Sequence, residues 1–310
     1  MTIPLSVILS VWNDEKHIAQ TIESILKQTF ADFEFIIIND GSTDKTQTIL
    51  DGYRARERRI KLINLPARSG LTKALNQGLA LAEGQFIARH DSGDLSSPER
   101  FEEQLEYLKR NQNIAACFSW AGVISDDDIS LGEFVFNHRP RTIKRRLLKA
   151  NNIFIHGSVM MRRDALNAVD GYDDAIKASQ DFDLWLRMLK AGFFIGAVPK
   201  ILYYWRLDPL SISISKGKKQ DFYRNMALNR YYQLPDDALE QSKVSEQESD
   251  DATARLQRYY LNLFWRVRNK QQYLASFKYL WKKNLITSRD ILKAFLIISP
   301  FDYRYLLRYF

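Results

Sequence analysis

The sequence has one cysteine, no long apolar run and neither of two common glycine-rich nucleotide-binding patterns. The lone Cys117 excludes a disulfide framework and a multi-thiolate metal site, and it favours a reducing cytosol. No apolar stretch approaches the roughly 20 residues of a membrane-spanning helix, and the N-terminus lacks a signal peptide's basic leader. The absence of G-x-G-x-x-G after the first strand and of G-x-x-x-x-G-K-[ST] argues against a dehydrogenase or an ATPase. We therefore expect a soluble or peripheral protein.

Positive charge is concentrated near the C-terminal end. The whole chain has a net charge of +8, but residues 255–310 alone hold 12 Lys/Arg against 2 Asp/Glu. This segment is also rich in Tyr, Trp, Phe and Leu, and such basic, aromatic helices dock at anionic membrane surfaces. The alternative is that its aromatic residues pack against the rest of the chain or against a second subunit, as in a homodimer. Nucleic-acid binding has no recognition motif in its favour.

Short apolar runs alternate with helical patterns through the first two thirds of the chain. The runs lie at 5–11, 33–38, 60–65 and 86–88, and each is followed by polar residues and then by apolar residues at helical spacing. This alternation predicts an α/β fold with a mostly parallel central sheet flanked by helices. A further strand-rich stretch at 193–205 is expected to break at Pro199. We place this domain at 1–215, a helix and acidic flexible linker at 216–254, and a helical basic extension at 255–310.

An acidic turn, Asp91-Ser92-Gly93-Asp94, follows the fourth predicted strand directly. Ser97 and Pro98 then have the residue types of a helix start, so strand, acidic turn and helix follow one another. In open α/β sheets, ligands bind beyond the carboxyl ends of the strands, which is where these carboxylates are expected. The turn suits a divalent cation or ribose hydroxyls, and it equally suits an ordinary solvated turn.

Other polar clusters also follow predicted strands, at Asn13-Asp14 and at Asn39-Asp40, and Gln180-Asp181 opens a helix further along. Together these clusters would line a cleft with anionic walls, and Arg68, after the third strand, could supply positive charge to a phosphorylated ligand. Asp181 has a structural alternative, because an acid in the first turn of a helix is favoured by the helix dipole.

Five motifs resemble, in order and spacing, those of the family 2 glycosyltransferases with the GT-A fold. They span roughly residues 3 to 215 and read S-V-I-L-S-V-W-N, I-I-I-N-D-G-S-T-D-K-T, A-L-N-Q-G-L, A-R-H-D-S-G-D-L-S-S-P-E-R-F-E-E-Q and S-Q-D-F-D-L-W-L-R-M-L. The resemblance implies a Rossmann-like fold and an inverting transferase. It would move a sugar from a nucleotide-diphosphate donor to a saccharide or lipid-linked acceptor in surface polysaccharide or glycolipid synthesis, usually with Mn²⁺ or Mg²⁺.

The resemblance also assigns roles to individual residues. Asp181 matches the family's general base, Asp40 would contact the nucleobase, and Asp91 is the first acid of the metal motif. The implied donor-binding residues are Val11, Asn13, Asn39, Asp40, Gly41, Arg68, Asp91 and Ser92. The implied acceptor-side residues are Gln180, Trp185 and His156. The implied metal ligands are Asp91, Asp94 and Asp208.

The sequence departs from the family pattern at the metal site. Gly93 stands where the family has the carboxylate that binds the metal directly, and Asp208 stands where it often has a histidine. Asn39 replaces a common aspartate, a smaller change because its amide keeps an acceptor oxygen. Either metal binding is weakened, with Asp94 or Asp208 as a substitute ligand, or the chain is a non-catalytic nucleotide-sugar binding or scaffolding protein. We expect an enzyme in the cytoplasm, with the tail on the inner face of the membrane.

Overall fold

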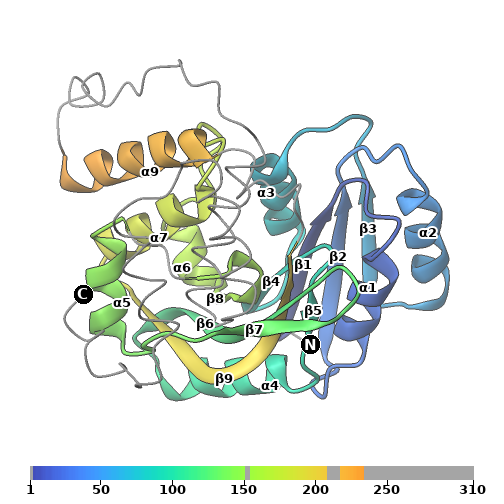
Figure 1. Cartoon of the computed structure of the whole chain (residues 1–310), viewed down its shortest axis with the longest axis horizontal. Coiled ribbons are helices and arrows are strands. Elements are labelled where there is room, and N and C mark those ends of the chain that lie inside the picture. The colour runs from blue at the N-terminus through green and yellow to red at the C-terminus, as the bar shows by residue number, and fades with distance from the viewer. Residues whose placement is uncertain (1–2, 151–153, 208–216, 234–310) are drawn as a thin grey trace, which may run out of the picture. The chain divides into compact units, whose positions relative to one another are not determined.

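Four parallel strands form the first half of the sheet in the computed structural model, which describes residues 3–150, 154–207 and 217–233 (Figure 1). In register, Val11 lies beside Asn39 and Ser10 beside Asp91, so the carboxyl ends of these strands meet at one edge. Nearly every residue of the first two strands is buried, as in strands covered by helices on both faces. The four strands are β1 (Leu5–Val11), β2 (Phe33–Asn39), β3 (Ile60–Asn64) and β4 (Phe86–Asp91).

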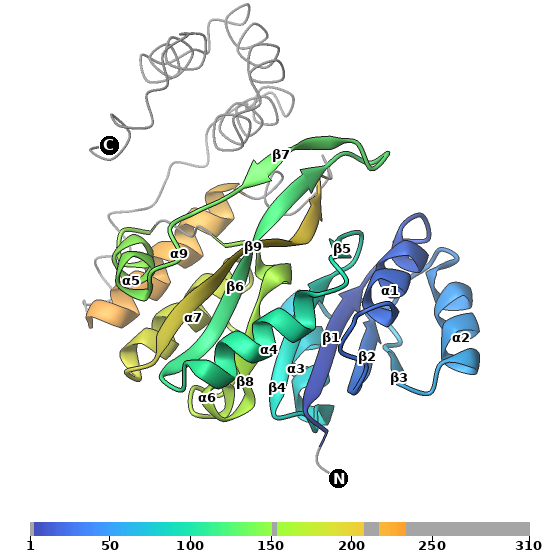
Figure 2. The same ribbon diagram turned by 90° about the horizontal axis from the view of Figure 1, so that it is seen from below.

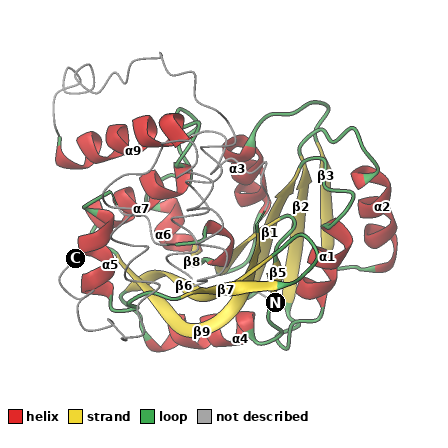
Figure 3. Cartoon of the chain, in the orientation of Figure 1, coloured by secondary structure: helices red, strands yellow, loops and turns green. Residues whose placement is uncertain are grey.

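Helices cover both faces of the sheet, and each face has its own apolar core (Figures 2 and 3). Successive strand side chains point to opposite faces, so Ile8 lies in one core and Val7 and Leu9 in the other. One core is closed by α1 (Ile18–Leu26), α2 (Thr46–Arg56) and α4 (Arg100–Arg110). The other is closed by α3 (Leu71–Leu81), α5 (Pro140–Leu147), α6 (Arg163–Asn167), α7 (Gln180–Lys190) and α9 (Gly217–Tyr232).

The second half of the sheet is antiparallel where its pairing is defined. The nine described strands follow the order β3-β2-β1-β4-β8-β6-β9-β5, with β7 paired to β6 off this path. β8 pairs antiparallel with both β4 and β6, and β5 pairs antiparallel with β9. The predicted α/β fold is confirmed, and its central sheet is mixed. The added strands are β5 (Leu95–Ser96), β6 (Ile114–Ile124), β7 (Ser130–Phe134), β8 (Met160–Arg162) and β9 (Phe194–Arg206).

Two local predictions were wrong. The helix expected to start after Ser97 and Pro98 begins at Arg100, because the preceding residues continue the sheet: Leu95 and Ser96 pair with β9, and Ser97 N–H donates to Leu202 O at 3.0 Å.

β9 also runs through Pro199 without the predicted break. Because β5 pairs only with Tyr203 and Tyr204, the exposed Pro199 lies on an unpaired stretch of that strand edge, where a proline is tolerated.

The chain divides into two compact units. The first comprises Met1–Gly122, Val135–Arg206 and Lys218–Lys243, and the second comprises Val123–Phe134, Leu207–Gly217 and Val244–Phe310. The predicted divisions at 215 and 254 stay predictions, since 208–216 and 234–310 lie outside the described residues, as does the basic extension. Within the described ranges, no helix combines the length and apolar character needed to cross a membrane.

Candidate active site

The loops that leave β1 and β2 are joined by hydrogen bonds from Asn13. Its side-chain oxygen accepts from Thr43 N–H at 2.8 Å, and its own N–H donates to Ser42 Oγ at 3.0 Å. Asn13 has a left-handed backbone (φ 49°), which asparagine tolerates better than most residues. Val11 accepts from Asp40 N–H at 2.8 Å. Val11 and Asn13 therefore fix the ends of β1 and β2 side by side.

Asn39 supports the loop that follows it. Its buried amide donates to Gln47 Oε1 at 2.5 Å, and its oxygen accepts from Ser42 N–H at 3.1 Å. An aspartate in this position could accept from Ser42 N–H but could not donate to Gln47 Oε1, because an ionised carboxylate has no hydrogen to donate. The replacement of the family's common aspartate thus has a local structural use.

Asp40 holds the loop between β3 and α3. Its carboxylate accepts from Ser69 N–H at 2.6 Å, from Ser69 Oγ at 2.8 Å and from Gly70 N–H at 2.9 Å. A Cβ atom on Gly41 would lie 2.5 Å from the carbonyl carbon of Ala67, so only glycine lets this loop come so close. The loop carries Arg68, whose guanidinium carbon lies 3.5 Å from the ring centre of Trp12. Sequence reasoning did not select Trp12, whose indole is 42% exposed.

The first acid of the turn after β4 is paired with a buried arginine. Arg89, on the same strand, forms an ion pair with Asp91, whose side chain is 37% exposed. The backbone N–H of Asp91 also donates to the Tyr203 hydroxyl at 3.2 Å. The ion pair therefore fixes the orientation of the Asp91 side chain, and part of that side chain stays exposed to solvent.

The second acid of the turn, Asp94, is buried. It accepts from the Tyr203 hydroxyl at 2.7 Å and from Arg206 N–H at 2.8 Å. Burial, together with the charge of Asp91, raises the pKa of Asp94 well above its usual value. The Arg206 side chain donates to Gly93 O at 2.7 Å and to Gln20 Oε1 at 2.8 Å, which ties β9 to the turn.

Gly93 occupies the position from which the family's metal ligand would project. It has a left-handed φ of 88°, and a Cβ there would have open space, with Asp14 Oδ2 at 4.0 Å as its nearest neighbour. Asp14 accepts from Ser92 Oγ, and burial raises the pKa of its carboxyl group. Ser92 and Gly93 therefore face the loop after β1.

The carboxylates of the described residues do not complete a metal site. No group of three or more His, Cys, Asp or Glu side chains is placed to hold an ion within the described ranges. Asp91 is engaged by Arg89, and both oxygens of Asp94 accept hydrogen bonds. Asp208, the remaining predicted ligand, lies outside the described residues.

The predicted acceptor-side residues lie around α7. Gln180 and Asp181 are its first two residues, and Trp185 follows Asp181 by four positions, on the same helix face. The His156 ring lies 6.1 Å from the Trp185 ring, and His156 Nε2 lies 2.7 Å from the Tyr172 hydroxyl. Burial, followed by the charge of Arg89, lowers the pKa of His156 well below its usual value, so this imidazole is neutral.

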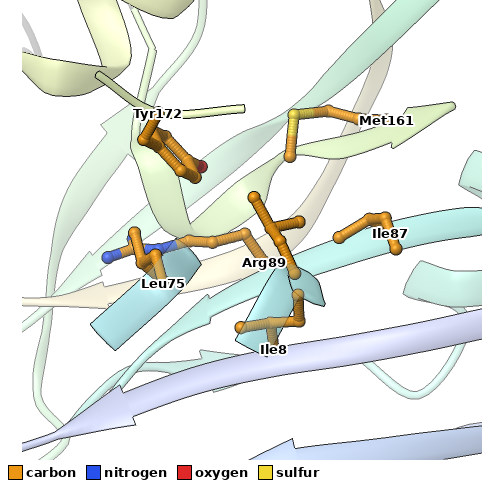
Figure 4. Close-up of a pocket in the computed structure, with 7 residues that line it drawn as sticks. Ile8, Leu75, Ile87, Arg89, Met161 and Tyr172 are labelled. Carbon is orange, nitrogen blue, oxygen red and sulfur yellow. The ribbon is translucent and has the colours of Figure 1, made fainter. Parts of the chain in front are cut away.

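The charges of both acidic groups act on the buried Tyr172. Burial raises its pKa, and the charges of Asp181 and Asp91 raise it further against the opposing charge of Arg89. Figure 4 shows Tyr172 and Arg89 beside apolar side chains around a small pocket, whose other lining residues are Ile8, Leu75, Leu79, Ile87 and Met161. The acid at the end of β4 and the acid opening α7 therefore both influence the same buried hydroxyl.

Comparison with protein families matches residues 6–170 to the family described as Glycosyl transferase family 2. The chain belongs to this family. The O-antigen biosynthesis glycosyltransferase WbnJ of Escherichia coli is 32% identical over 186 residues, which cover 60% of this chain and 71% of WbnJ.

Two solved structures share the fold of this family 2 glycosyltransferase. S. aureus TarS (1–349) in complex with UDP-GlcNAc aligns with a TM-score of 0.58 and 18% identity, covering 95% of this chain and 90% of that one. The mannosyltransferase PcManGT from Pyrobaculum calidifontis, in complex with GDP-Man and Mn²⁺, aligns with a TM-score of 0.55 and 14% identity, covering 98% and 82%. The predicted GT-A-like fold is confirmed by these alignments.

Sequence reasoning missed several residues of the candidate site. Arg89 had a signal, since an arginine in a buried strand run (F-I-A-R-H-D) needs a counter-charge nearby. Tyr172, Tyr203 and Arg206 had none, because each reaches the site from a distant segment. Trp12 had a weak signal as a large aromatic directly after a strand.

Proposed function

We propose that this family 2 glycosyltransferase transfers a sugar, with inversion, from a nucleotide-diphosphate sugar to a hydroxyl group of a saccharide or lipid-linked acceptor. The observation that supports the proposal is that Asp91, at the end of β4, and Asp181, in the first turn of α7, both lie near enough to the buried Tyr172 for their charges to raise its pKa. A transferase needs a donor site and a base within one cleft, and these two acids would serve one each.

The donor side would be built from the loops after the parallel strands. Trp12 offers a half-exposed ring face for a base, and Arg68 lies against it as a cation for the diphosphate. Asp91, held by Arg89, keeps one side toward solvent for the ribose hydroxyls. Asp40 would contact the base only after giving up its hydrogen bonds to Ser69 or Gly70.

The acceptor side would depend on Asp181. As the acceptor oxygen attacks the anomeric carbon from the face opposite the diphosphate, a base must take its proton, and attack from that face inverts the configuration. Asp181 lies in the first turn of α7, where the helix dipole favours its ionised form. His156 and Trp185 would support this wall, with Gln180 beside the base.

We also propose that dependence on Mn²⁺ or Mg²⁺ is weaker here than in relatives with a full acidic motif. Gly93 contributes no ligand, and Asp94 is buried, with a hydrogen bond already accepted by each of its oxygens. A divalent ion prefers several oxygen ligands at once, which the described residues do not provide.

The pathway is inferred from the relatives. The O-antigen biosynthesis enzyme and the UDP-GlcNAc complex support a role in surface polysaccharide synthesis with a nucleotide-sugar donor. The rival function is a non-catalytic nucleotide-sugar binding protein, which Gly93 favours and the retained Asp40, Asp91 and Asp181 oppose.

The test begins by screening nucleotide sugars for an increase in melting temperature, because a donor at a hundred times its dissociation constant stabilises by about 2.7 kcal/mol. Transfer and donor hydrolysis are then measured with the selected donor for the wild type, Asp181→Asn and Asp32→Asn. Asp32 is an exposed acid that precedes β2, at the end opposite the site, and serves as the control. We expect Asp181→Asn alone to abolish both reactions while donor binding is kept. Donor binding with neither reaction in the wild type would instead support the non-catalytic function.

A further inference from the structure

The segment around α5 carries six cationic side chains and no acid. Residues 138–149 read H-R-P-R-T-I-K-R-R-L-L-K. Within the part of the chain that the structure describes, no salt bridge or side-chain hydrogen bond engages any of these lysines and arginines, whereas other cations such as Lys61 and Arg187 do have carboxylate partners. The six are Arg139, Arg141, Lys144, Arg145, Arg146 and Lys149.

The helix buries one side and exposes these charges on the other. Ile143 and Leu147 are fully buried in the core, and α5 packs against α7 and β9. Arg141, Arg145 and Lys149 are exposed and follow one another at intervals of four, which places them along one stripe. Like charges at this spacing repel, so the helix carries an electrostatic cost that only an anionic partner would relieve.

An exposed aromatic side chain lies beside this basic stripe. The Tyr232 hydroxyl at the end of α9 donates to Leu148 O at 3.4 Å, and Tyr232 is 50% exposed. A tyrosine with an apolar ring and a polar tip next to clustered cations is the combination found at membrane interfaces. A soluble polyanion would need the cations but would gain little from the exposed ring.

We propose that the exposed face of α5, with Tyr232, docks on an anionic phospholipid surface. The proposal is independent of the sugar transfer and of the basic tail, since α5 and Tyr232 both lie within the first compact unit. Each basic residue near an anionic leaflet strengthens binding about fivefold, so the three exposed cations of the stripe together account for roughly 100-fold. A face docked in this way would hold α7, against which α5 packs, near the membrane, where lipid-linked acceptors are found.

The experiment uses the full chain, so that the tail is the same in every variant. Flotation with vesicles of phosphatidylglycerol and phosphatidylcholine, and with phosphatidylcholine alone, is measured for the wild type and for Arg141→Glu/Arg145→Glu/Lys149→Glu. The matched control is Arg54→Glu/Arg58→Glu/Lys73→Glu, three exposed cations on and near other helices, which changes the net charge equally. Retained donor binding and unchanged melting temperature show that both triple variants are folded.

We expect the α5 variant to bind anionic vesicles roughly 100-fold more weakly than the control variant. The difference should shrink at high salt, because salt screens exposed charges. Equal flotation of the two variants would overturn the proposal and leave any membrane binding to other segments. An α5 variant that loses binding to heparin but keeps vesicle binding would also overturn it, since the face would then serve a soluble polyanion.

Discussion

Arg68 and Trp12 lie on loops that follow different strands, yet the guanidinium carbon of Arg68 is 3.5 Å from the centre of the Trp12 ring. Such cation–π contacts at partly exposed positions contribute about 0.5–1 kcal/mol. A base that stacks on the ring face covered by Arg68 would displace the guanidinium, which would leave it free to meet the diphosphate.

This relationship predicts that replacing Arg68 affects nucleoside diphosphate binding differently from nucleoside binding. Arg68→Ala should weaken binding of the preferred nucleoside diphosphate about tenfold, as expected for the loss of one charge-assisted contact of about 1.5 kcal/mol or more. It should leave binding of the matching nucleoside unchanged or slightly tighter, because the ring face is uncovered. Calorimetric titration of both ligands checks this, with the exposed Arg58→Ala as control. A parallel loss for both ligands would show that Arg68 only shapes the loop.

Gly93→Asp should restore a metal ligand. The new side chain would enter open space near Asp14, and aspartate tolerates the left-handed φ of 88° better than most residues. We expect donor binding to become more dependent on Mn²⁺, measured as the ratio of dissociation constants with Mn²⁺ and with EDTA. Gly93→Asn has the same size and backbone strain without the charge, so it should not change the ratio. An unchanged ratio in Gly93→Asp would mean that the turn does not face the metal.

The hydrogen bond between Tyr172 and His156 should appear as an energetic coupling. Tyr172→Phe leaves the Nε2 of the half-buried His156 without the buried hydroxyl that it contacts, which costs about 1–3 kcal/mol of unfolding free energy. Removing both polar groups should cost less than the sum of the single changes. Urea unfolding of Tyr172→Phe, His156→Phe and the double variant measures this coupling. Additive changes would show that the two groups do not depend on one another.

The sequence predicted the parallel half of the fold because that half is local. Each of β1 to β3 is a strand followed by its own helix, β4 is followed by the short β5 and then α4, and the polar residues at the strand exits are read directly from the chain. Parallel pairing then brings Asn13, Asn39 and Asp91 to one edge without further information.

The residues that surround the turn after β4 could not be predicted in the same way. Asp94 was expected at the surface as a metal ligand, yet Tyr203 and Arg206 bury it from more than 100 positions away in the sequence. Leu95 and Ser96 likewise pair with β9, and the helix expected after Ser97 begins only at Arg100. Such long-range antiparallel contacts leave no periodic signal in the segment that they reshape.

His90 should make the stability of the protein fall in mild acid. It is fully buried, with Nδ1 2.8 Å from Asp91 O and Nε2 3.0 Å from Ser96 Oγ. A carbonyl oxygen only accepts, so Nδ1 carries the proton, and Nε2 accepts from the Ser96 hydroxyl, which in turn accepts from Arg100 at 3.0 Å. Protonating Nε2 would break this chain of hydrogen bonds.

The sign of the pH effect follows from the neutral state of His90. Burial, and then the charge of Arg100, lowers its folded-state pKa well below the value of 6.5 expected in the unfolded chain. Below pH 6.5 the unfolded state therefore binds more protons, and the free energy of unfolding falls by up to about 1.4 kcal/mol per pH unit. The raised pKa of Asp94 acts in the opposite direction, so the contribution of His90 must be isolated by comparison.

Urea unfolding of the wild type and of His90→Gln, measured at intervals from pH 7.5 to pH 5, provides that comparison. The stability of the wild type relative to His90→Gln should be constant above pH 7 and should decline steadily below pH 6.5, whatever the absolute cost of the substitution. His138→Gln is the matched control, because it makes the same substitution at an exposed histidine. Parallel profiles for wild type and His90→Gln would show that His90 is not held neutral by its hydrogen bonds.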